Sequence, residues 1–401
     1  MNSIPTTIGN FIEKEGRNDT TFLELQIQGR QVSHLDIVFH TMRFGAAQVR
    51  CATLSDVATE KEYRNQGYAA HLIEHSKNVM RRKGAALSIV DGIRNFYHRF
   101  GYGFVQPTSF ISVYHNPDEK TLLPQGWVFR PFAQHDLAAV QQLYNDNILN
   151  CSGAVMRTGS GVVWTQLAAV SEEDIGKSCR VLLNSTGEVV AYAWRGMEFW
   201  KPRHIQGEGT DFFLIAEAFA SDGQAANALI AACREWARGT LTAEADDFLH
   251  VVYYVPPQSR MAHAAKFHTS RFWKNFHPSG GFRALVLDTQ QLFISLQPEL
   301  DRRIRSTRLP QPWRVVFKTD AGTSILECSN RGVTLCEEEL SGENDVAIHL
   351  SQQTLAQMVF GSFSAADLYL QSEPKAEAEL LALLDTLFPH NEPYTFPVDI
   401  V

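Results

Sequence analysis

The feature that most constrains this chain is the stretch from residue 46 to residue 92, where patterns typical of a strand, a glycine turn, a helix and a second strand follow one another. The run AAQVRCATLSDVA leads directly into the turn EYRNQGYAA. Apolar residues then recur at three- and four-residue steps, which predicts an amphipathic helix of about fifteen residues ending near Gly84. AALSIVDG predicts the second strand. This order favours an α/β fold with the turn at the end of a sheet.

The turn itself carries a candidate anion site. Arg64, Gly67 and Ala69 fit the pattern Arg/Gln-x-x-Gly-x-Gly/Ala at the start of the helix. Small residues let a ligand approach the backbone, and the first helical turn has N–H donors without helical partners. Such a helix start binds phosphate. The bland alternative is an ordinary glycine turn that begins a helix, because the pattern is short enough to occur by chance.

The rest of the chain divides into further units. A chain of 401 residues is too long for one core, and the proline-containing segment 114–126 is typical of a linker. Residues 210–237 repeat the order strand, turn, helix, but without the arginine, so they predict the same plan without the phosphate site. From about residue 300, short strands and then helices predict an α+β module. The predicted domains are 1–118, 119–298 and 299–401.

Composition and motifs exclude several functions. The net charge of −8 argues against a nucleic-acid partner and favours a cationic substrate. The sequence has no Walker GxxxxGKS/T, Rossmann GxGxxG, HExxH or GxSxG pattern. The scattered cysteines and histidines show no metal-ligand spacing, so we expect no metal. With no apolar run near the ~20 residues that span a bilayer and no signal-peptide pattern, we expect a cytoplasmic protein without a membrane partner.

The end of the chain has a pattern of its own. Three prolines in FPHNEPYTFPVDIV exclude a helix. The apolar residues Tyr394, Phe396, Val398 and Ile400 alternate with the period of an extended, half-buried strand. Since chain ends usually fray, a terminus that stays apolar to its last residue predicts that it is docked against the protein.

These segments together resemble a known family. LSDVATEKEYRNQGYAAHLIE, followed by GIRNFYHRFGYGF, resembles the acetyl-CoA motif and the later catalytic segment of the GNAT acyltransferase superfamily. The arrangement of an active GNAT half, a degenerate GNAT half and a sterol-carrier-like module ending in EPYTFPVDIV resembles the Eis N-acetyltransferases over nearly the whole chain. The resemblance implies tandem GNAT domains of α/β class and a C-terminal sterol-carrier-protein-like α+β domain. It further implies acetyl-CoA as co-substrate, a small-molecule amine as acceptor, and a homo-oligomer, a hexamer built from trimers.

The resemblance also implies site residues. The cofactor contacts of the family fall on the end of the first strand, on the glycine turn and on the segment after the second strand. These residues are Val57, Ala58, Thr59, Arg64, Asn65, Gln66, Gly67, Tyr68, Ala69, Ala70, Gly92 and Ile93.

Two catalytic residues follow from the same resemblance. The general acid is the tyrosine of FYHRFGYG, Tyr97, and the general base is the α-carboxylate of the last residue, Val401, where Eis proteins often have phenylalanine. A phenol can protonate a departing thiolate, and burial would raise the low pKa of a terminal carboxylate. The alternatives are a core aromatic at position 97, a solvated carboxylate on an edge strand at position 401, and Asp56 as the base.

The N-terminus departs from the family. GNAT domains begin with a strand and two helices, but only about twenty residues precede TFLELQIQ. We interpret IGNFIEKEG as the remnant of the second helix. Because these elements line the acceptor pocket in the family, a non-catalytic CoA- or lipid-binding protein is the second hypothesis, and a scaffold is the third.

Overall fold

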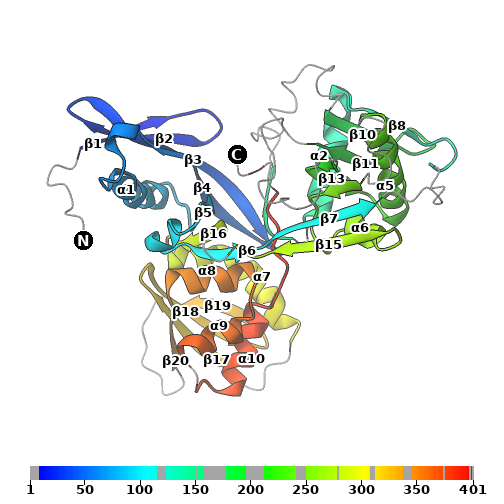
Figure 1. The fold of residues 1–401 in the computed structure, drawn as a ribbon. Coiled ribbons are helices and arrows are strands. Elements are labelled where there is room, and N and C mark those ends of the chain that lie inside the picture. Colours follow the sequence, from blue (N-terminus) through cyan, green and yellow to red (C-terminus); the bar gives the residue numbers. More distant parts are fainter. Residues whose placement is uncertain are drawn as a thin grey trace.

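The computed structural model describes residues 9–114, 123–149, 151–157, 178–195, 212–240, 250–277, 280–307, 312–336, 345–373, 375–396 and 399. Figure 1 shows them as three groups of elements. β1–β5 and α1 lie at the upper left, the elements around α2 and α5 at the upper right, and β17–β20 with α7–α10 below. Mixed α/β and α+β architecture confirms the predicted fold class. None of the described helices combines the length and apolarity needed to cross a membrane.

The first sheet contains the predicted strand–turn–helix–strand unit. Its strand order is β1-β2-β3-β4-β5-β16-β6, with β9 paired to β3. The strands are β1 (Asn10–Glu15), β2 (Thr20–Ile27), β3 (Arg30–Phe44), β4 (Ala47–Thr59), β5 (Leu87–Gly92), β6 (Gly103–Gln106), β9 (Ser152–Val155) and β16 (Gly281–Val286). Helix α1 (Tyr68–Arg82) follows the turn, and Gly84 lies just beyond its end with φ of 79°. The predicted length and end of this helix are confirmed, because its apolar stripe packs on the sheet.

The interpretation of IGNFIEKEG as a helix is wrong. Residues 10–15 form β1, which pairs antiparallel with β2. Alternate side chains of β1 reach α1: Phe11 stacks on His75 with ring centroids 4.0 Å apart, and Glu13 pairs with Arg82 at 2.8 Å. This two-residue period suits a strand, and the open edge of β2 supplies the backbone partners that a helix would not have used.

The second group contains two four-stranded sheets. One has the order β13-β11-β10-β8 and the other the order β12-β14-β7-β15. The strands are β7 (Thr108–Tyr114), β8 (Val128–Pro131), β10 (Cys179–Leu183), β11 (Val189–Trp194), β12 (Phe212–Ile215), β13 (Glu217–Ala220), β14 (His250–Tyr253) and β15 (Ser270–Asn275). The helices are α2 (Leu137–Asn147), α5 (Gly223–Arg238) and α6 (Arg260–Ala265). The predicted strand, turn and helix of 210–237 correspond to β12, β13 and α5.

Two strands cross between these groups. β7 belongs to the second group although it directly follows β6 of the first sheet, and β16 is inserted between β5 and β6 although it follows β15. In Figure 1 the yellow-green β16 accordingly lies within the blue and cyan sheet. The predicted boundaries stay a prediction: strands from both sides of residue 118 pair with each other, whereas the described strands after residue 298 form a sheet of their own.

The third group is a four-stranded sheet with helices. Its strand order is β19-β18-β17-β20, and the run of four strands followed by a run of helices confirms the α+β prediction for the C-terminal module. The strands are β17 (Trp313–Thr319), β18 (Gly322–Ser329), β19 (Gly332–Cys336) and β20 (Asp345–His349). The helices are α7 (Thr289–Arg305), α8 (Gln352–Phe360), α9 (Ala365–Ser372) and α10 (Ala378–Leu387). The apolar faces of these strands and helices form one core together with part of the first sheet.

The last described residues run back from the third group. In Figure 1 this red segment rises between the two upper groups. Tyr394 and Phe396 are 2% and 0% exposed, and the Tyr394 N–H donates to Ser152 O at 2.9 Å. The prediction that the tail is docked is confirmed for these residues, but they form no strand, and the intervening Thr395 is also buried, at 3% exposed, so the expected half-burial is not seen. Val398 and Ile400 lie outside the described residues.

Candidate active site

The predicted turn has the backbone that its glycine requires. Gly67 is the N-cap of α1 with φ of 85°, and Asn65 also has a positive φ, of 62°. Side chains of the L configuration rarely adopt this region, so the glycine and the asparagine fit it. A Cβ at Gly67 would meet no atom within 4 Å, so the space in front of the helix is open. The turn therefore exposes backbone to a ligand, as the motif predicts.

The start of α1 differs from the start of its counterpart α5. At α5 the side chain of Asp222 accepts a hydrogen bond from Ala225 N at 2.8 Å, so a carboxylate already occupies the helix N-terminus. At α1 no side chain caps the helix, and its first turn contains no acidic residue. The N–H groups of the first helical turn, Tyr68, Ala69 and Ala70, are therefore available to an anion. In the second half a carboxylate thus lies where an anion would bind, and the assignment of the phosphate site to α1 alone stays a prediction.

The strands in front of the turn separate from each other. β4 and β5 pair in parallel at residues 51–53 and 87–89. Beyond these pairs, 54–59 of β4 remain with β3, while 90–92 of β5 pair with β16. A gap in the ladder between two parallel strands leaves backbone N–H and C=O groups that an extended ligand can use.

A β-bulge lies where β4 turns away. Ser55 faces Asp36, and Ala58 faces His34, so two residues of β4 face one residue of β3. Asp56, one of the two, has φ of 46°. A bulge bends and twists its strand, which gives the local reason for the separation of β4 from β5.

Beyond the bulge, the backbone direction is set by two hydrogen bonds. The Glu60 N–H donates to Val32 O at 2.9 Å, toward β3. Thr59 O instead accepts from Arg64 Nε at 3.0 Å, which joins the end of β4 to the turn. Because successive backbone groups of a strand point to opposite sides, the N–H of Thr59, next to Glu60, points away from β3 and toward the opening.

Tyr97 lies at the end of the neighbouring strand. A Cβ on Gly92 would come within 3.1 Å of Tyr97 Cδ2, so the ring packs against the backbone of this glycine. Tyr97 begins a short 3-10 helix at Tyr97–Phe100 and is 6% exposed. Burial, with a smaller effect of the Asp91 charge, raises the pKa of its phenol to about 12. The phenol therefore keeps its proton at neutral pH, as a general acid must.

The structure links several of the predicted residues. Val57, Tyr68 and Tyr97 contact one apolar cluster, and the Arg64–Thr59 hydrogen bond links strand and turn. Ala58 and Gln66 are held by Ser33 Oγ (2.7 Å to Ala58 O) and by Glu62 O (3.1 Å from Gln66 Nε2).

Three other predicted site residues are exposed or lie outside the described residues. Ile93, after β5, is 60% exposed. Asp56, the alternative base, has a side chain that is 70% exposed and lies 3.4 Å from His34 Nε2. Val401 lies outside the described residues, so its role as the base stays a prediction.

Sequence reasoning missed a buried charged cluster at the end of the chain. Arg157, Glu217 and Asp399 are in direct contact, with side chains 2%, 0% and 1% exposed. Tyr192 Oη donates to Glu217 at 2.6 Å. The three charged residues are far apart in the sequence and belong to no motif, so only a contact map could have found them.

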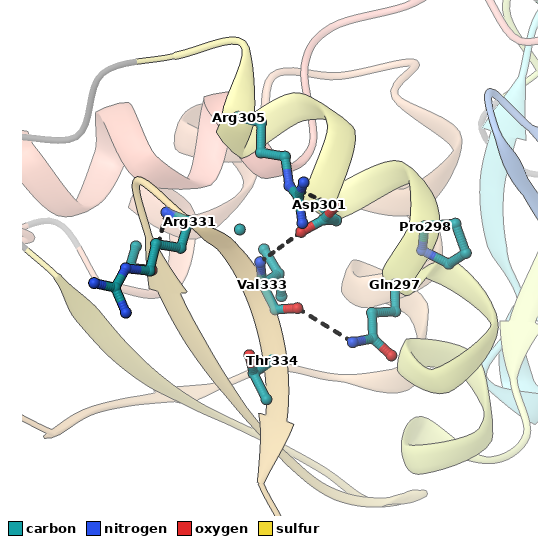
Figure 2. Close-up of a pocket in the computed structure, with 9 residues that line it drawn as sticks. Gln297, Pro298, Asp301, Arg305, Arg331, Val333 and Thr334 are labelled. Carbon is teal, nitrogen blue, oxygen red and sulfur yellow. Dashed lines mark hydrogen bonds and ion pairs between the residues drawn. The ribbon is translucent and has the colours of Figure 1, made fainter.

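A pocket of about 330 Å³ lies in the third group, between α7 and β19 (Figure 2). Asp301 accepts the Val333 N–H at 3.1 Å and pairs with Arg305 at 2.8 Å, while Gln297 donates to Val333 O at 3.2 Å. Arg331 also lines it. Because these side chains are polar or charged, this pocket does not suit the hydrocarbon chain of a lipid.

Comparison with known families identifies two domains. Residues 13–105 match the family described as an acetyltransferase (GNAT) domain, which is the segment that contains the turn and Tyr97. Residues 315–396 match the sterol carrier protein domain. The chain therefore contains a GNAT acetyltransferase domain and, toward its C-terminal end, a sterol-carrier-like domain.

Solved structures share the arrangement over nearly the whole chain. A probable N-acyltransferase from Enterococcus faecalis V583 has 13% identity and a TM-score of 0.70, with 94% of this chain and 89% of that chain covered. A GCN5-related N-acetyltransferase from Anabaena variabilis has 13% identity, the same coverage and a TM-score of 0.65. Eis1 from Mycobacterium abscessus has 11% identity, 93% and 89% coverage, and a TM-score of 0.58. At such identities the likeness shows the fold. No curated protein matches the sequence.

Proposed function

We propose that this protein is an Eis-like N-acetyltransferase that transfers acetyl from acetyl-CoA to a primary amine by direct attack in a ternary complex. The observation that carries this proposal is the uncapped start of α1 at Gly67, joined through Arg64 to the end of β4 where that strand separates from β5. The pyrophosphate of the coenzyme would bind the first helical turn, and the extended pantetheine arm would lie along the separated strands.

The residues then have distinct chemical roles. The N–H groups of Val57 and Thr59 would stabilise the oxyanion on the thioester carbon, an effect typically worth about 3 kcal/mol. The amine nitrogen forms the new C–N bond, and its proton goes to the α-carboxylate of Val401. The C–S bond breaks, and the Tyr97 phenol protonates the departing thiolate. Holding both substrates together lowers the remaining barrier by about 7 kcal/mol or more.

A cationic, aminoglycoside-like polyamine is the proposed acceptor. The chain carries a net charge of −8. Asp56 lies in the bulge of β4 and Asp36 on β3 beside it, and burial, followed by the charge of Asp56, raises the pKa of Asp36. A bound cation would reduce the repulsion between these two carboxylates.

The proposal is tested by thiol release from acetyl-CoA, and from longer acyl-CoAs, across a panel of amines. The variants are Tyr97→Phe, a chain with one residue added after Val401, and Asp56→Asn. We expect the first two to lose turnover and Asp56→Asn to retain most of it, because its exposed carboxylate is not the base. Full activity in the extended chain would exclude the terminal carboxylate as base.

One observation favours the second candidate, a non-catalytic CoA-binding protein. Among the described residues, β2 is preceded by the strand β1, where the family has the helices that line its acceptor pocket. Tight binding of CoA without turnover on any amine would support this candidate. Absence of CoA binding would contradict both.

The cellular setting is also a proposal. We propose a cytoplasmic, homo-oligomeric enzyme that needs no metal and binds neither nucleic acid nor membrane. Phe267, Phe272 and Phe276, on and beside strand β15 at the edge of its sheet, are 81%, 45% and 52% exposed and could contribute to contacts between subunits. Sedimentation would distinguish a hexamer from a smaller assembly.

A further inference from the structure

The buried cluster of Arg157, Glu217 and Asp399 is held by many hydrogen bonds. Arg157 Nε and Nη2 donate to the two carboxylate oxygens of Asp399 at 2.7 and 3.0 Å. Arg157 Nη1 and Nη2 donate to the two oxygens of Glu217 at 2.9 and 2.5 Å. One guanidinium thus binds two carboxylates, each through two bonds, in a geometry that fixes both partners.

Aromatic side chains enclose the cluster. The guanidinium carbon of Arg157 lies 3.9 Å from the centre of the Tyr144 ring and 5.7 Å from that of Phe396. Tyr144 Oη donates to Val155 O at 2.6 Å and lies 3.4 Å from Asp399 Oδ2. These contacts exclude water and orient the guanidinium plane.

The cluster lies where the first sheet meets the second group. Arg157 follows β9, which pairs with β3, and the neighbouring Met156 N–H donates to Thr41 O of β3 at 2.8 Å. Glu217 begins β13 and Tyr192 lies on β11, both in the second group. The cluster therefore joins the C-terminal tail to elements of both GNAT-like halves.

The tail that leads to Asp399 is fixed at earlier points as well. The Thr395 N–H donates to Gln106 Oε1 of β6 at 2.8 Å, and Thr395 Oγ1 donates to Gly153 O of β9 at 2.6 Å. The Asp399 N–H donates to Phe396 O at 2.9 Å. The tail is thus fixed by hydrogen bonds at Thr395 and again at Asp399.

Stability alone does not explain a buried ionic cluster. Apolar residues of similar volume often replace buried ion pairs without loss of stability, whereas ionic hydrogen bonds fix direction and register. Val401 lies two residues beyond Asp399, and two residues extend a chain by about 7 Å at most. A group that fixes Asp399 therefore also restricts where the terminal carboxylate can be.

We propose that Arg157 and Glu217 form a clamp that grips Asp399 and thereby positions the α-carboxylate of the chain for acyl transfer. These are positioning residues that act through the chain end, and the inference rests on the proposed function. The clamp would also make activity depend on the packing of the tail between the two halves, because Arg157 follows β9 of the first sheet and its side chain binds Glu217 of the second group.

The experiment compares wild type with Asp399→Asn and Glu217→Gln, which keep the side-chain shape but remove one charge. The matched control is Lys274→Ala, which breaks an exposed ion pair of the same tail, Lys274 Nζ to Glu392 at 3.2 Å. The first readout is steady-state thiol release. We expect kcat to fall at least tenfold in both clamp variants, with KM for acetyl-CoA changed less than threefold, and no change in the control.

The second readout does not need activity. Carboxypeptidase digestion followed by mass spectrometry measures how fast the terminal valine and isoleucine are released from folded protein, with circular dichroism as the check on folding. We expect release at least fivefold faster in each clamp variant than in wild type or Lys274→Ala.

The outcomes separate the two ideas. Unchanged kcat in a folded clamp variant, or unchanged release of the terminal residues, overturns the clamp. If wild type turns over no amine, the proposed enzyme function fails, and the digestion still decides whether Arg157 and Glu217 hold the chain end. If Asp399→Asn does not fold, Glu217→Gln decides alone, because it weakens the two bonds that hold Arg157 in place and leaves Asp399 itself unchanged.

Discussion

The two buried tyrosines of FYHRFGYG give a test in which the same chemical change has opposite results. Tyr97→Phe removes a hydroxyl that no described residue hydrogen-bonds, so the free energy of unfolding should change by less than about 1 kcal/mol. Loss of a general acid lowers the rate by typically 10²–10⁴-fold, which raises the barrier by about 3–5 kcal/mol. We therefore expect kcat to fall by that factor in a protein of normal stability.

Tyr102→Phe is the matched control. The Tyr102 hydroxyl is fully buried and lies 2.6 Å from Ser88 Oγ, so its removal leaves the serine hydroxyl buried without that partner. Such a loss costs about 1–3 kcal/mol of stability. Its hydroxyl is bonded within the core, so kcat should stay within about threefold of wild type.

The assay pairs thiol release at saturating acetyl-CoA with urea unfolding of the same preparations. Because burial raises the pKa of Tyr97 to about 12, its protonated form persists above pH 10, and wild-type kcat should show no alkaline loss near the ordinary tyrosine pKa of about 10. A Tyr97→Phe protein with normal kcat, or a Tyr102→Phe protein with the larger rate loss, would refute the assignment of the acid.

Three further predictions use other parts of the structure. Gly67→Ala and Gly84→Ala both place a side chain at positive φ with no atom within 4 Å, so each variant should lose about 1–2 kcal/mol of stability. Only Gly67→Ala should also raise KM for acetyl-CoA, by about tenfold. Burial raises the pKa of Asp399 to about 6 against 3.8, with Arg157 opposing and Glu217 adding to the shift. A raised carboxyl pKa gives stability that is present below pH 3.8 and lost as the pH rises through about 6. In wild type the free energy of unfolding should therefore fall by about 3 kcal/mol more than in Asp399→Asn between pH 4 and 7, as measured by urea unfolding. The same pH dependence in both proteins would contradict this. Glu299→Gln should lower the free energy of unfolding by about 2–4 kcal/mol, because the buried carboxylate accepts from Ala46 N at 2.9 Å and pairs with two arginines of α7. An unchanged free energy of unfolding would show that these bonds contribute nothing.

Local patterns of the sequence were sufficient for much of the fold. The stripe from Ala69 to Met80 predicted α1, and the alternation of Tyr394 and Phe396 predicted a buried, extended tail. The same reasoning failed at residues 10–15, because the free edge of β2 and the basic end of α1 turned a charged, helix-compatible segment into a strand. Local propensity is weak compared with such tertiary partners.

What the sequence determined by itself is the backbone chemistry of the turn. Only a residue such as Gly67 accepts φ of 85° at the start of a helix, and a helix that begins without a side-chain cap offers its N–H groups to an anion. That property is local, so a motif of six residues contains it.

The tertiary structure alone decided what lies around the turn. The separation of β4 from β5 depends on a bulge opposite β3 and on β16, a strand from residues 281–286 that joins the first sheet. The grip of Arg157 on Asp399 joins residues 242 positions apart. Such contacts depend on how distant segments pack and on the water they exclude, and no sequence period records them.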